Sequence, residues 1–309
     1  MDILIDILLI KMTIILKGSI IMRNVLVTGG SGFVGSHLII ELLKRYPDIN
    51  ITSLSENEGI ISQLLPQRPD KRLSLIIGDI KNASAISYAL EDKDTVLHLA
   101  AMKYVDLCEV NSREAARINV IGTMNVLDAF RGDTFILMST NKVVEPSNCY
   151  GGTKLVAERL VLERARKATS GHRFMIIRSG NIMGATGSVL DIWKNQIEQG
   201  NEITVTHPDM ERYYTSIERV VKLYIAVLER GENGKLYFTP QGEPMILKAF
   251  VDKALKQYGN DRTKVKCVGL RLGERMTERM RTPDEINTIA GFEECEIVTV
   301  PEKKVGVKI

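Results

Sequence analysis

A tyrosine and a lysine stand four positions apart in the segment YGGTK, at Tyr150 and Lys154. Side chains at positions i and i+4 share one face of a helix, so the lysine ammonium would lie close to the phenol. A positive charge there favours the tyrosinate and lowers the pKa of the tyrosine. The pair is therefore a candidate proton acceptor for the oxidation of an alcohol, and the lysine could also bond the ribose of a nicotinamide cofactor.

A second reactive group, Thr140-Asn141-Lys142, precedes Tyr150 by eight residues, counted from Lys142. It follows the apolar run 134–138, which predicts a strand. A hydroxyl, an amide and an amine would thus meet at the carboxyl end of that strand. A YxxxK pair alone is common by chance, but together with this motif and a glycine-rich loop it becomes specific.

The glycine-rich loop is the stretch TGGSGFVG, which has the spacing GxxGxxG. It directly follows the predicted strand 24–28 and opens a helix whose apolar residues recur every four positions. The first glycine permits the tight turn, the second lets the backbone approach a pyrophosphate, and the third allows the helix to pack closely on the strand. A purely structural turn is the alternative. The residues predicted to line this dinucleotide site are Gly29, Ser31, Gly32, Phe33, Val34 and Gly35.

Two carboxylates follow the next predicted strands, 49–54 and 73–77. Glu56 lies 21 residues beyond Gly35, where an acidic side chain accepts the adenosine ribose hydroxyls and repels a 2′-phosphate. No lysine or arginine adjoins it in the segment LSENE, so NAD is favoured over NADP. Asp79, after the third predicted strand, is placed to reach the adenine edge.

Strand-like apolar runs alternate with helical patterns over the first part of the chain. This alternation predicts parallel βαβ units covered on both faces, a doubly wound α/β (Rossmann) fold. The predicted strands are 24–28, 49–54, 73–77, 95–99, 134–138 and 174–177, and the longest predicted helices are 114–130 and 150–168. Because the rhythm loosens afterwards, we expect an apolar extension at 1–22, a dinucleotide-binding domain at 23–180 and a smaller substrate lobe at 181–309.

Composition narrows the expected partners. The 309 residues carry 41 basic and 38 acidic side chains, and a net charge of +3 gives no reason to expect nucleic acid. The four cysteines and four histidines are scattered, so we expect no disulfide framework, no metal site and a reducing, cytoplasmic location. Charges at Asp2, Asp6, Lys11 and Lys17 argue against a membrane span or a signal peptide at the N-terminus. An upstream start codon and an oligomer-forming or membrane-surface arm both stay open there.

The motifs together resemble those of the extended short-chain dehydrogenase/reductases. The stretches TGGSGFVGSHL, GDI, LHLAAMKYVD, NVIGTMNVL, STNK and YGGTK occur in the order expected for that group. Within it, the chain is similar to the inverting UDP-N-acetylglucosamine 4,6-dehydratases of polysaccharide biosynthesis. The narrower resemblance rests on AMKYV with CE, GNIMG with GSV, MERYYT and GLRLGER.

The resemblance implies a redox-assisted loss of water from a UDP-N-acetylhexosamine. Tyr150 would take the proton of the 4-hydroxyl while the nicotinamide takes the C4 hydride, and the 4-keto group would acidify the C5 proton. Lys142 matches the base at C5, and Thr140 would hold the 4-oxygen. Water leaves from C6 and the hydride returns there, with inversion at C5 left open.

The resemblance also implies contacts beyond the reacting groups. The further cofactor positions are Ile80, Ala100, Ala101 and Lys103. The substrate positions are Lys103 near the sugar or phosphates, Asn181 on a phosphate or the sugar, Arg212 and Arg271 on the pyrophosphate, and Glu274 on the uridine ribose. The helices 114–130 and 150–168 match those that form a dimer bundle in this family, so we expect a homo-oligomer.

Two positions depart from the family pattern. Asn141 replaces an aspartate that is thought to protonate the departing C6 hydroxyl, and an amide cannot act as a general acid. Either Glu145 or Glu109 supplies the proton, or elimination is slow, or the enzyme stops at C4 as a 4-epimerase or 4-ketoreductase. Ser179 stands where many relatives have an aromatic residue. A non-catalytic NAD(P)-binding sensor is a further alternative, although it leaves Tyr150 and Lys154 unexplained.

Overall fold

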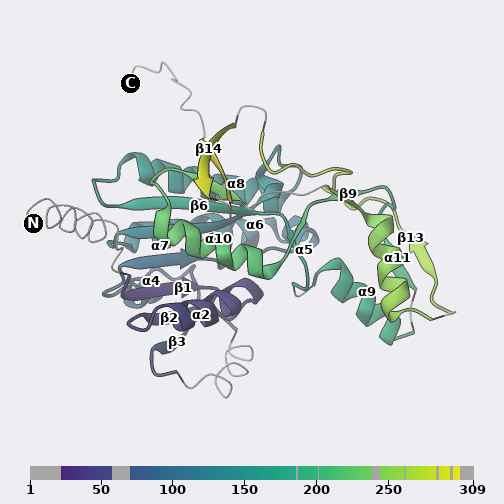
Figure 1. The fold of residues 1–309 in the computed structure, drawn as a ribbon, viewed down its shortest axis with the longest axis horizontal. Coiled ribbons are helices and arrows are strands. Elements are labelled where there is room, and N and C mark those ends of the chain that lie inside the picture. The colour runs from purple at the N-terminus through teal and green to yellow at the C-terminus, as the bar shows by residue number, and fades with distance from the viewer. Residues whose placement is uncertain are drawn as a thin grey trace, which may run out of the picture.

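The computed structural model describes residues 22–57, 70–185, 187–200, 202–238, 244–260, 262–282, 285–292 and 295–299. The strands of its main sheet are β1 (Asn24–Thr28), β2 (Asn50–Ser55), β3 (Leu73–Ile77), β4 (Thr95–His98), β5 (Thr134–Thr140), β6 (Arg173–Ser179), β11 (Leu236–Phe238), β14 (Ile286–Phe292) and β15 (Cys295–Thr299). Their order is β14-β15-β11-β6-β5-β4-β1-β2-β3 (Figure 1). The seven strands from β11 to β3 are parallel, whereas β15 and β14 add an antiparallel edge. The predicted doubly wound α/β fold is confirmed.

Helices cover both faces of this sheet. On one face lie α2 (Phe33–Arg45) and α10 (Ile217–Arg230), which pack on each other, and on the other lie α4 (Ala83–Ala89), α7 (Thr123–Ala129) and α8 (Cys149–Arg166). Successive strand residues alternate between the two cores, because side chains in a strand point to opposite faces. Val25 and Val27 join the first core, and Leu26 joins the second.

The helix predicted at 114–130 is not continuous in the structure. After α5 (Val105–Val110), the chain forms α6 (Ser112–Ala116), a π-helical turn η1 (Arg117–Gly122) and then α7. Asn119 lies in this turn, is 1% exposed and contacts Met102 and Thr153 with its side chain. Such π turns occur often at functional sites, where they re-aim a side chain.

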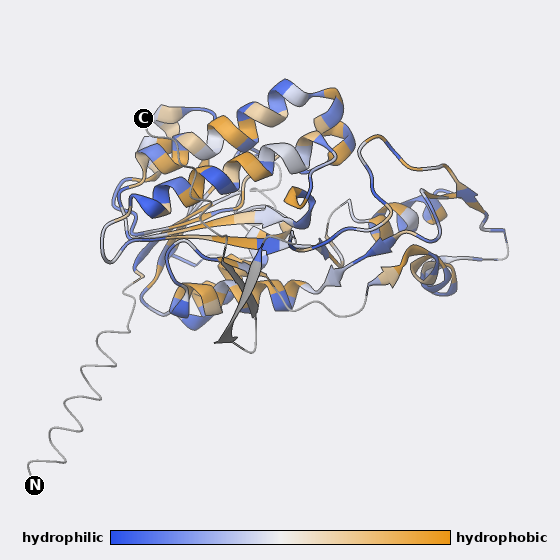
Figure 2. Cartoon of the chain, turned by 90° about the horizontal axis from the view of Figure 1, so that it is seen from above, coloured by the Kyte–Doolittle hydropathy of each residue, from blue (hydrophilic) through white to orange (hydrophobic). Residues whose placement is uncertain are grey.

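A second, smaller body adjoins the carboxyl ends of the central strands. It contains α9 (Val189–Glu198), α11 (Leu247–Tyr258) and the strand pairs β8 (Ile203–Val205) with β13 (Val265–Cys267) and β9 (Glu211–Arg212) with β12 (Met245–Ile246). It has its own apolar core, made of Trp193, Ile203, Val205, Met210, Leu247, Phe250, Val251 and Ala254. Figure 2 shows this lobe projecting sideways from the sheet and its helices.

The chain beyond residue 180 divides between the lobe and the sheet. The pair β7 (Asn181–Ile182) with β10 (Tyr214–Thr215) connects the two bodies, and then α10 and β11 return to the main sheet. The predicted boundary at 180 therefore does not separate the two cores, because β11 completes the parallel sheet. Residues 1–21 of the predicted extension lie outside the described residues.

Candidate active site

The glycine-rich loop follows β1 at the point where the strand order reverses, between β1 and β4. Gly29 has φ +71°, and a Cβ there would stand 2.8 Å from the backbone nitrogen of Ala100. A Cβ at Gly35 would stand 2.5 Å from the Gly29 carbonyl oxygen, so the helix meets the loop too closely for any side chain. Gly32 caps α2 without a side-chain bond, and no acidic residue occupies the first turn. The free N–H groups of Phe33 and its neighbours fit an anion.

The two predicted adenosine contacts lie beside this loop. The Ser31 backbone N–H donates to Ser55 Oγ at 3.1 Å, which ties the loop to the end of β2, where Glu56 follows. Asp79 follows β3 and accepts from the Lys81 backbone N–H at 2.8 Å, while the Lys81 ammonium lies 3.1 Å from its other oxygen. The ribose contact of Glu56 and the adenine contact of Asp79 both stay predictions.

A buried histidine lies beneath the loop. His98 Nδ1 is 2.7 Å from Thr28 Oγ1, and its Nε2 is 3.0 Å from Thr123 Oγ1. Because the Thr123 hydroxyl donates to the Asn119 carbonyl at 2.8 Å, we assign the ring proton to Nε2, and Nδ1 accepts from Thr28. Burial lowers the pKa of His98 to about 3, with a smaller contribution from the Lys154 charge. The ring is therefore neutral.

Asn119 extends these hydrogen bonds to α8, the helix that contains Tyr150 and Lys154. Its side chain bonds both the backbone N–H and the carbonyl of Met102, at 2.9 and 3.0 Å, and it donates to Thr153 Oγ1 at 3.0 Å. The Thr153 hydroxyl in turn donates to the Tyr150 carbonyl at 2.9 Å. We call this chain of uncharged groups the neutral network; it comprises Thr28, His98, Thr123, Asn119 and Thr153.

The tyrosine–lysine pair lies in the first turns of α8, as predicted. Asn148 caps this helix by accepting from the Gly151 N–H at 2.8 Å. Burial raises the pKa of Tyr150 to about 12, although a hydrogen bond with Thr140 opposes the rise. Burial lowers the pKa of Lys154 to about 8, opposed by the charge of Glu158. The predicted lowering of the Tyr150 pKa by Lys154 is therefore wrong for the protein alone, because burial dominates and the Lys154 charge is not among the causes of the shift.

Behind Lys154 lies a buried ion triad. Arg178, 1% exposed, binds both oxygens of Glu158 at 2.8 and 3.1 Å and both oxygens of Glu285 at 2.9 and 3.0 Å. Burial would lower the pKa of Arg178, but the two carboxylates raise it above its usual value. The triad joins β6, α8 and the residue just before β14 at one point.

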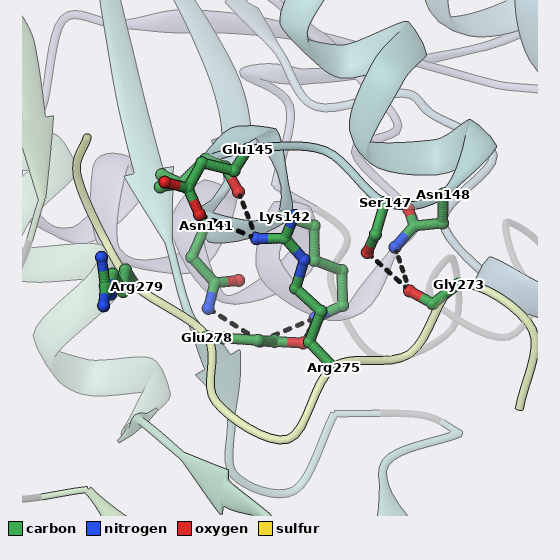
Figure 3. Close-up of a pocket in the computed structure, with 10 residues that line it drawn as sticks. Asn141, Lys142, Glu145, Ser147, Asn148, Gly273, Arg275, Glu278 and Arg279 are labelled. Carbon is green, nitrogen blue, oxygen red and sulfur yellow. Dashed lines mark hydrogen bonds and ion pairs between the residues drawn. The ribbon is translucent and has the colours of Figure 1, made fainter. Parts of the chain in front are cut away.

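A second ionic group forms around the Thr-Asn-Lys motif, where Thr140 ends β5 and Asn141–Val143 form the single turn η2. Asn141 donates its amide to Glu278 Oε2 at 2.8 Å, and the Lys142 ammonium lies 3.1 and 3.2 Å from the two oxygens of Glu278 (Figure 3). The Arg212 guanidinium completes the set at 3.4 Å. Burial alone would raise the pKa of Glu278, but these neighbours outweigh burial and lower it.

Glu278 belongs to the segment 269–280, whose backbone is hydrogen-bonded to residues at the start of α8. Ser147 Oγ and Asn148 Nδ2 both donate to the Gly273 carbonyl, at 2.8 and 3.1 Å. Arg212 is 8% exposed and donates to the backbone carbonyls of 211, 275 and 276. Its bonds hold this segment, and the predicted pyrophosphate contact of Arg212 stays a prediction.

A pocket beside Glu278 is lined by residues that include Asn141, Lys142, Gly273 and Arg279 (Figure 3). The other predicted substrate residues are not among those that line it. Glu274 accepts from the Arg271 backbone N–H at 2.9 Å, and the exposed Arg271 side chain lies 3.9 Å from Asp106. Asn181 donates to the Tyr213 carbonyl at 3.4 Å. Lys103 lies 5.1 Å from the centre of the neighbouring Tyr104 ring. The ligands of these four residues stay predictions.

The two expected substitute acids have other partners. Glu109 accepts from the Cys149 backbone N–H at 2.6 Å, so it fixes the start of α8. Glu145 lies 3.2 Å from the Arg275 guanidinium at the exposed rim of the pocket. The acid that contacts Asn141 is Glu278, which the sequence interpretation missed. A signal was present: Glu278 follows the GLRLGER motif by three residues. Glu158 and Asn119 were missed too, although Glu158 follows Lys154 by four positions on one helix.

A doubly wound sheet with a glycine-rich loop at its switch point, and a Tyr–Lys pair on the helix after β5, define an extended short-chain dehydrogenase/reductase. The chain belongs to the polysaccharide biosynthesis protein family, whose model matches residues 25–300. It is an enzyme of the group that includes nucleotide-sugar dehydratases and epimerases.

Three similar proteins illustrate this placement. A Methanocaldococcus jannaschii protein described as an uncharacterized membrane protein is 33% identical over 285 residues, covering 89% of this chain and 85% of that protein. The UDP-glucose 4-epimerase of Rickettsia rickettsii is 32% identical over 273 residues, covering 85% and 79%. The solved structure of Pen from Bacillus thuringiensis superimposes with a TM-score of 0.84 at 29% identity, covering 91% and 90%.

Two further findings concern metals and membranes. Among the residues that the structure describes, no three His, Cys, Asp or Glu side chains gather in a way that could hold a metal ion. Within the same residues, none of the helices has the length and apolarity that a membrane span needs.

Proposed function

We propose that the chain is an NAD-dependent 4,6-dehydratase acting on UDP-N-acetylglucosamine or a close UDP-N-acetylhexosamine. One observation carries this proposal: the Lys142–Glu278 ion pair lies against Asn141, and the charge of Glu278 also acts on Tyr150. Chemistry confined to C4 needs only Tyr150, Lys154 and Thr140. A second pair able to transfer protons in the same place supports a reaction that continues to C5 and C6.

The glycine-rich loop fits a dinucleotide, because Gly29 and Gly35 leave no room for a Cβ and the first turn of α2 has free N–H groups. The loop would hold the pyrophosphate, Glu56 the adenosine ribose and Lys154 the nicotinamide ribose. The carboxylate at 56 favours NAD over NADP. When bound, the nicotinamide would supply a positive charge near the phenol and an acceptor for the C4 hydride, which would later be returned to C6.

The chain's own residues supply the proton chemistry at C4. Tyr150 takes the proton of the 4-hydroxyl, and Lys154 favours the phenolate form by its charge. Thr140, already hydrogen-bonded to Tyr150, holds the 4-oxygen. The lobe, with Asn181, Arg271 and Glu274, would receive the UDP part.

The surroundings of the site support two further proposals. Exposed apolar side chains on α5, η1 and α8, namely Leu107, Val110, Ile121 and Val156, support a homo-oligomer formed through these helices. Cys108, Cys149 and Cys267 are free thiols, which supports a reducing compartment, and we propose the cytoplasm.

A UDP-sugar 4-epimerase is the second candidate. It is favoured by the Rickettsia relative of that description and by the loss of the family acid at Asn141. The test is one incubation of purified protein with UDP-N-acetylglucosamine in deuterated water without added cofactor, repeated with UDP-glucose. Loss of one water with deuterium at C5 supports the dehydratase. Unchanged mass with an inverted C4 hydroxyl overturns it in favour of the epimerase.

A further inference from the structure

The loss of the family acid at position 141 has a structural counterpart in Glu278. This side chain is 9% exposed and is surrounded by groups that suit a carboxylate: the Asn141 amide at 2.8 Å, the Lys142 ammonium at 3.1 and 3.2 Å and Arg212 at 3.4 Å. The amide of Asn141 donates toward it, a bond that an ionised aspartate at this position could not make. The asparagine and the buried glutamate therefore fit each other.

The ion pair decides which member can donate a proton and which can accept one. The Lys142 ammonium is paired with both oxygens of Glu278, and an ammonium group has N–H donors but no lone pair to accept a proton. The same contacts favour the carboxylate form of Glu278, and its pKa is lowered accordingly. A carboxylate is a sufficient base for a proton next to a carbonyl group.

We propose that Glu278 and Lys142 are the proton-transferring pair of the elimination, with Glu278 as the base at C5 and Lys142 as the acid at C6. This assignment rests on the proposed dehydratase function, and it reverses the role that the family resemblance implies for Lys142. The Glu278 carboxylate and the Lys142 ammonium together carry one transferable proton. The aspartic acid and neutral lysine that the family pattern implies would carry the same number.

The protons and electrons balance over the reaction. In the 4-keto sugar, Glu278 takes the C5 proton, the electrons of the C5–H bond form the C5=C6 double bond, and the C6–O bond breaks. The leaving hydroxyl takes a proton from the Lys142 ammonium and departs as water. The Glu278 carboxyl, whose acidic proton exchanges with solvent, gives a proton to C5 as the hydride is returned to C6. Lys142 regains, through solvent, the proton that Tyr150 took from the 4-hydroxyl.

The test compares Glu278→Gln and Lys142→Gln with the unaltered holoenzyme on UDP-N-acetylglucosamine in deuterated water. Three signals are followed: the near-ultraviolet absorbance of reduced nicotinamide for C4 oxidation, deuterium at C5 by NMR, and loss of water by mass. Glu278→Gln should keep C4 oxidation and lose C5 exchange by about 100-fold or more, the lower range for a general base. Lys142→Gln should keep C5 exchange and lose water elimination by a similar factor.

Two further variants control the comparison. Glu163→Gln removes an exposed Glu–Lys pair on α8 and should change none of the three signals. Glu145→Gln tests the competing acid at the pocket rim; a loss of elimination in it would overturn the assignment.

The remaining outcomes separate the two proposals. Unchanged C5 exchange in Glu278→Gln, or lost exchange in Lys142→Gln, overturns the pair while leaving the dehydratase intact. Unaltered protein that oxidises C4 but neither exchanges C5 nor releases water overturns the dehydratase and this inference with it. If Glu278→Gln does not fold, as judged by its unfolding midpoint, C5 exchange in Lys142→Gln decides alone, because the two assignments predict opposite results for it.

Discussion

Two polar networks hold the reactive side chains, and they differ in charge. The neutral network joins β1, β4, the π turn and α8 through uncharged groups, and each of its bonds has a defined donor and acceptor. The ionic groups around Arg178 and Glu278 join α8, β5 and β6 to the C-terminal part of the chain. The first network lies next to the glycine-rich loop, and the second lies beside the Thr-Asn-Lys motif and Lys154, where we propose that the sugar binds.

This difference follows from what each end must do. Backbone geometry under the loop can be fixed by neutral hydrogen bonds, which carry a modest desolvation cost when both partners are present. Buried charges cost more, and replacing them by apolar groups is often neutral or stabilising. The buried charges around Glu278 are explained if proton transfer needs them there. The buried charge of Glu158 is explained if it helps to keep Lys154 protonated.

The largest expected effect is on the chemistry where the two networks meet. Tyr150→Phe removes the hydroxyl but keeps the ring, so C4 oxidation should fall by a factor on the order of 10² to 10⁴. Absorbance of the reduced nicotinamide measures it. Thermal unfolding should change little, and a variant that still oxidises C4 at the original rate would remove Tyr150 from the mechanism.

The next effect concerns stability at the ionic end. Arg178→Met leaves Glu158 and Glu285 buried without a cation, which should lower the free energy of unfolding by about 3–5 kcal/mol. Denaturant unfolding measures it. The triple variant with Glu158→Gln and Glu285→Gln should recover much of the loss. Equal losses in both variants would show that the charge is not the cause.

The neutral end should respond to pH instead. The pKa of His98 is lowered from 6.5 to about 3 in the folded protein, so the unfolded chain binds more protons between these values. Stability therefore falls as pH decreases through this window, by about 2 kcal/mol between pH 8 and pH 5 for this group alone. Unfolding free energies of the natural chain and His98→Gln test this. Equal pH slopes in the two would contradict it.

The smallest effect tests whether the neutral network reaches the catalytic helix. Thr153→Val keeps the shape but removes the hydroxyl between Asn119 and the Tyr150 carbonyl. The expected loss is about 1 kcal/mol of unfolding free energy. Calorimetry measures it, together with the rate of C4 oxidation. No change in either would confine the network to β1, β4, the π turn and the start of α7.

The two ends were also unequally predictable from the sequence. The sheet strands and the glycine-rich loop followed from local apolar runs and spacing, and six of the predicted strands have observed counterparts within two residues at each end. Tyr150 and Lys154 lie one helical turn apart, so their common face was predictable. Glu278 reaches Lys142 across 136 positions and Arg178 reaches Glu285 across 107, and no local pattern encodes such pairings. The π turn was also hidden, because an extra residue in a helix leaves the apolar pattern nearly unchanged.

The anchoring of the segment 269–280 has a consequence for engineering. Gly273 is bound to the catalytic helix, Arg212 of the lobe holds the backbone around it, and Glu278 follows five residues later. Exchanging the lobe with that of a relative to alter sugar preference would therefore also exchange the group beside Lys142. In this protein, substrate choice and reaction outcome are not separable modules, and a graft has to match position 141 to the incoming segment.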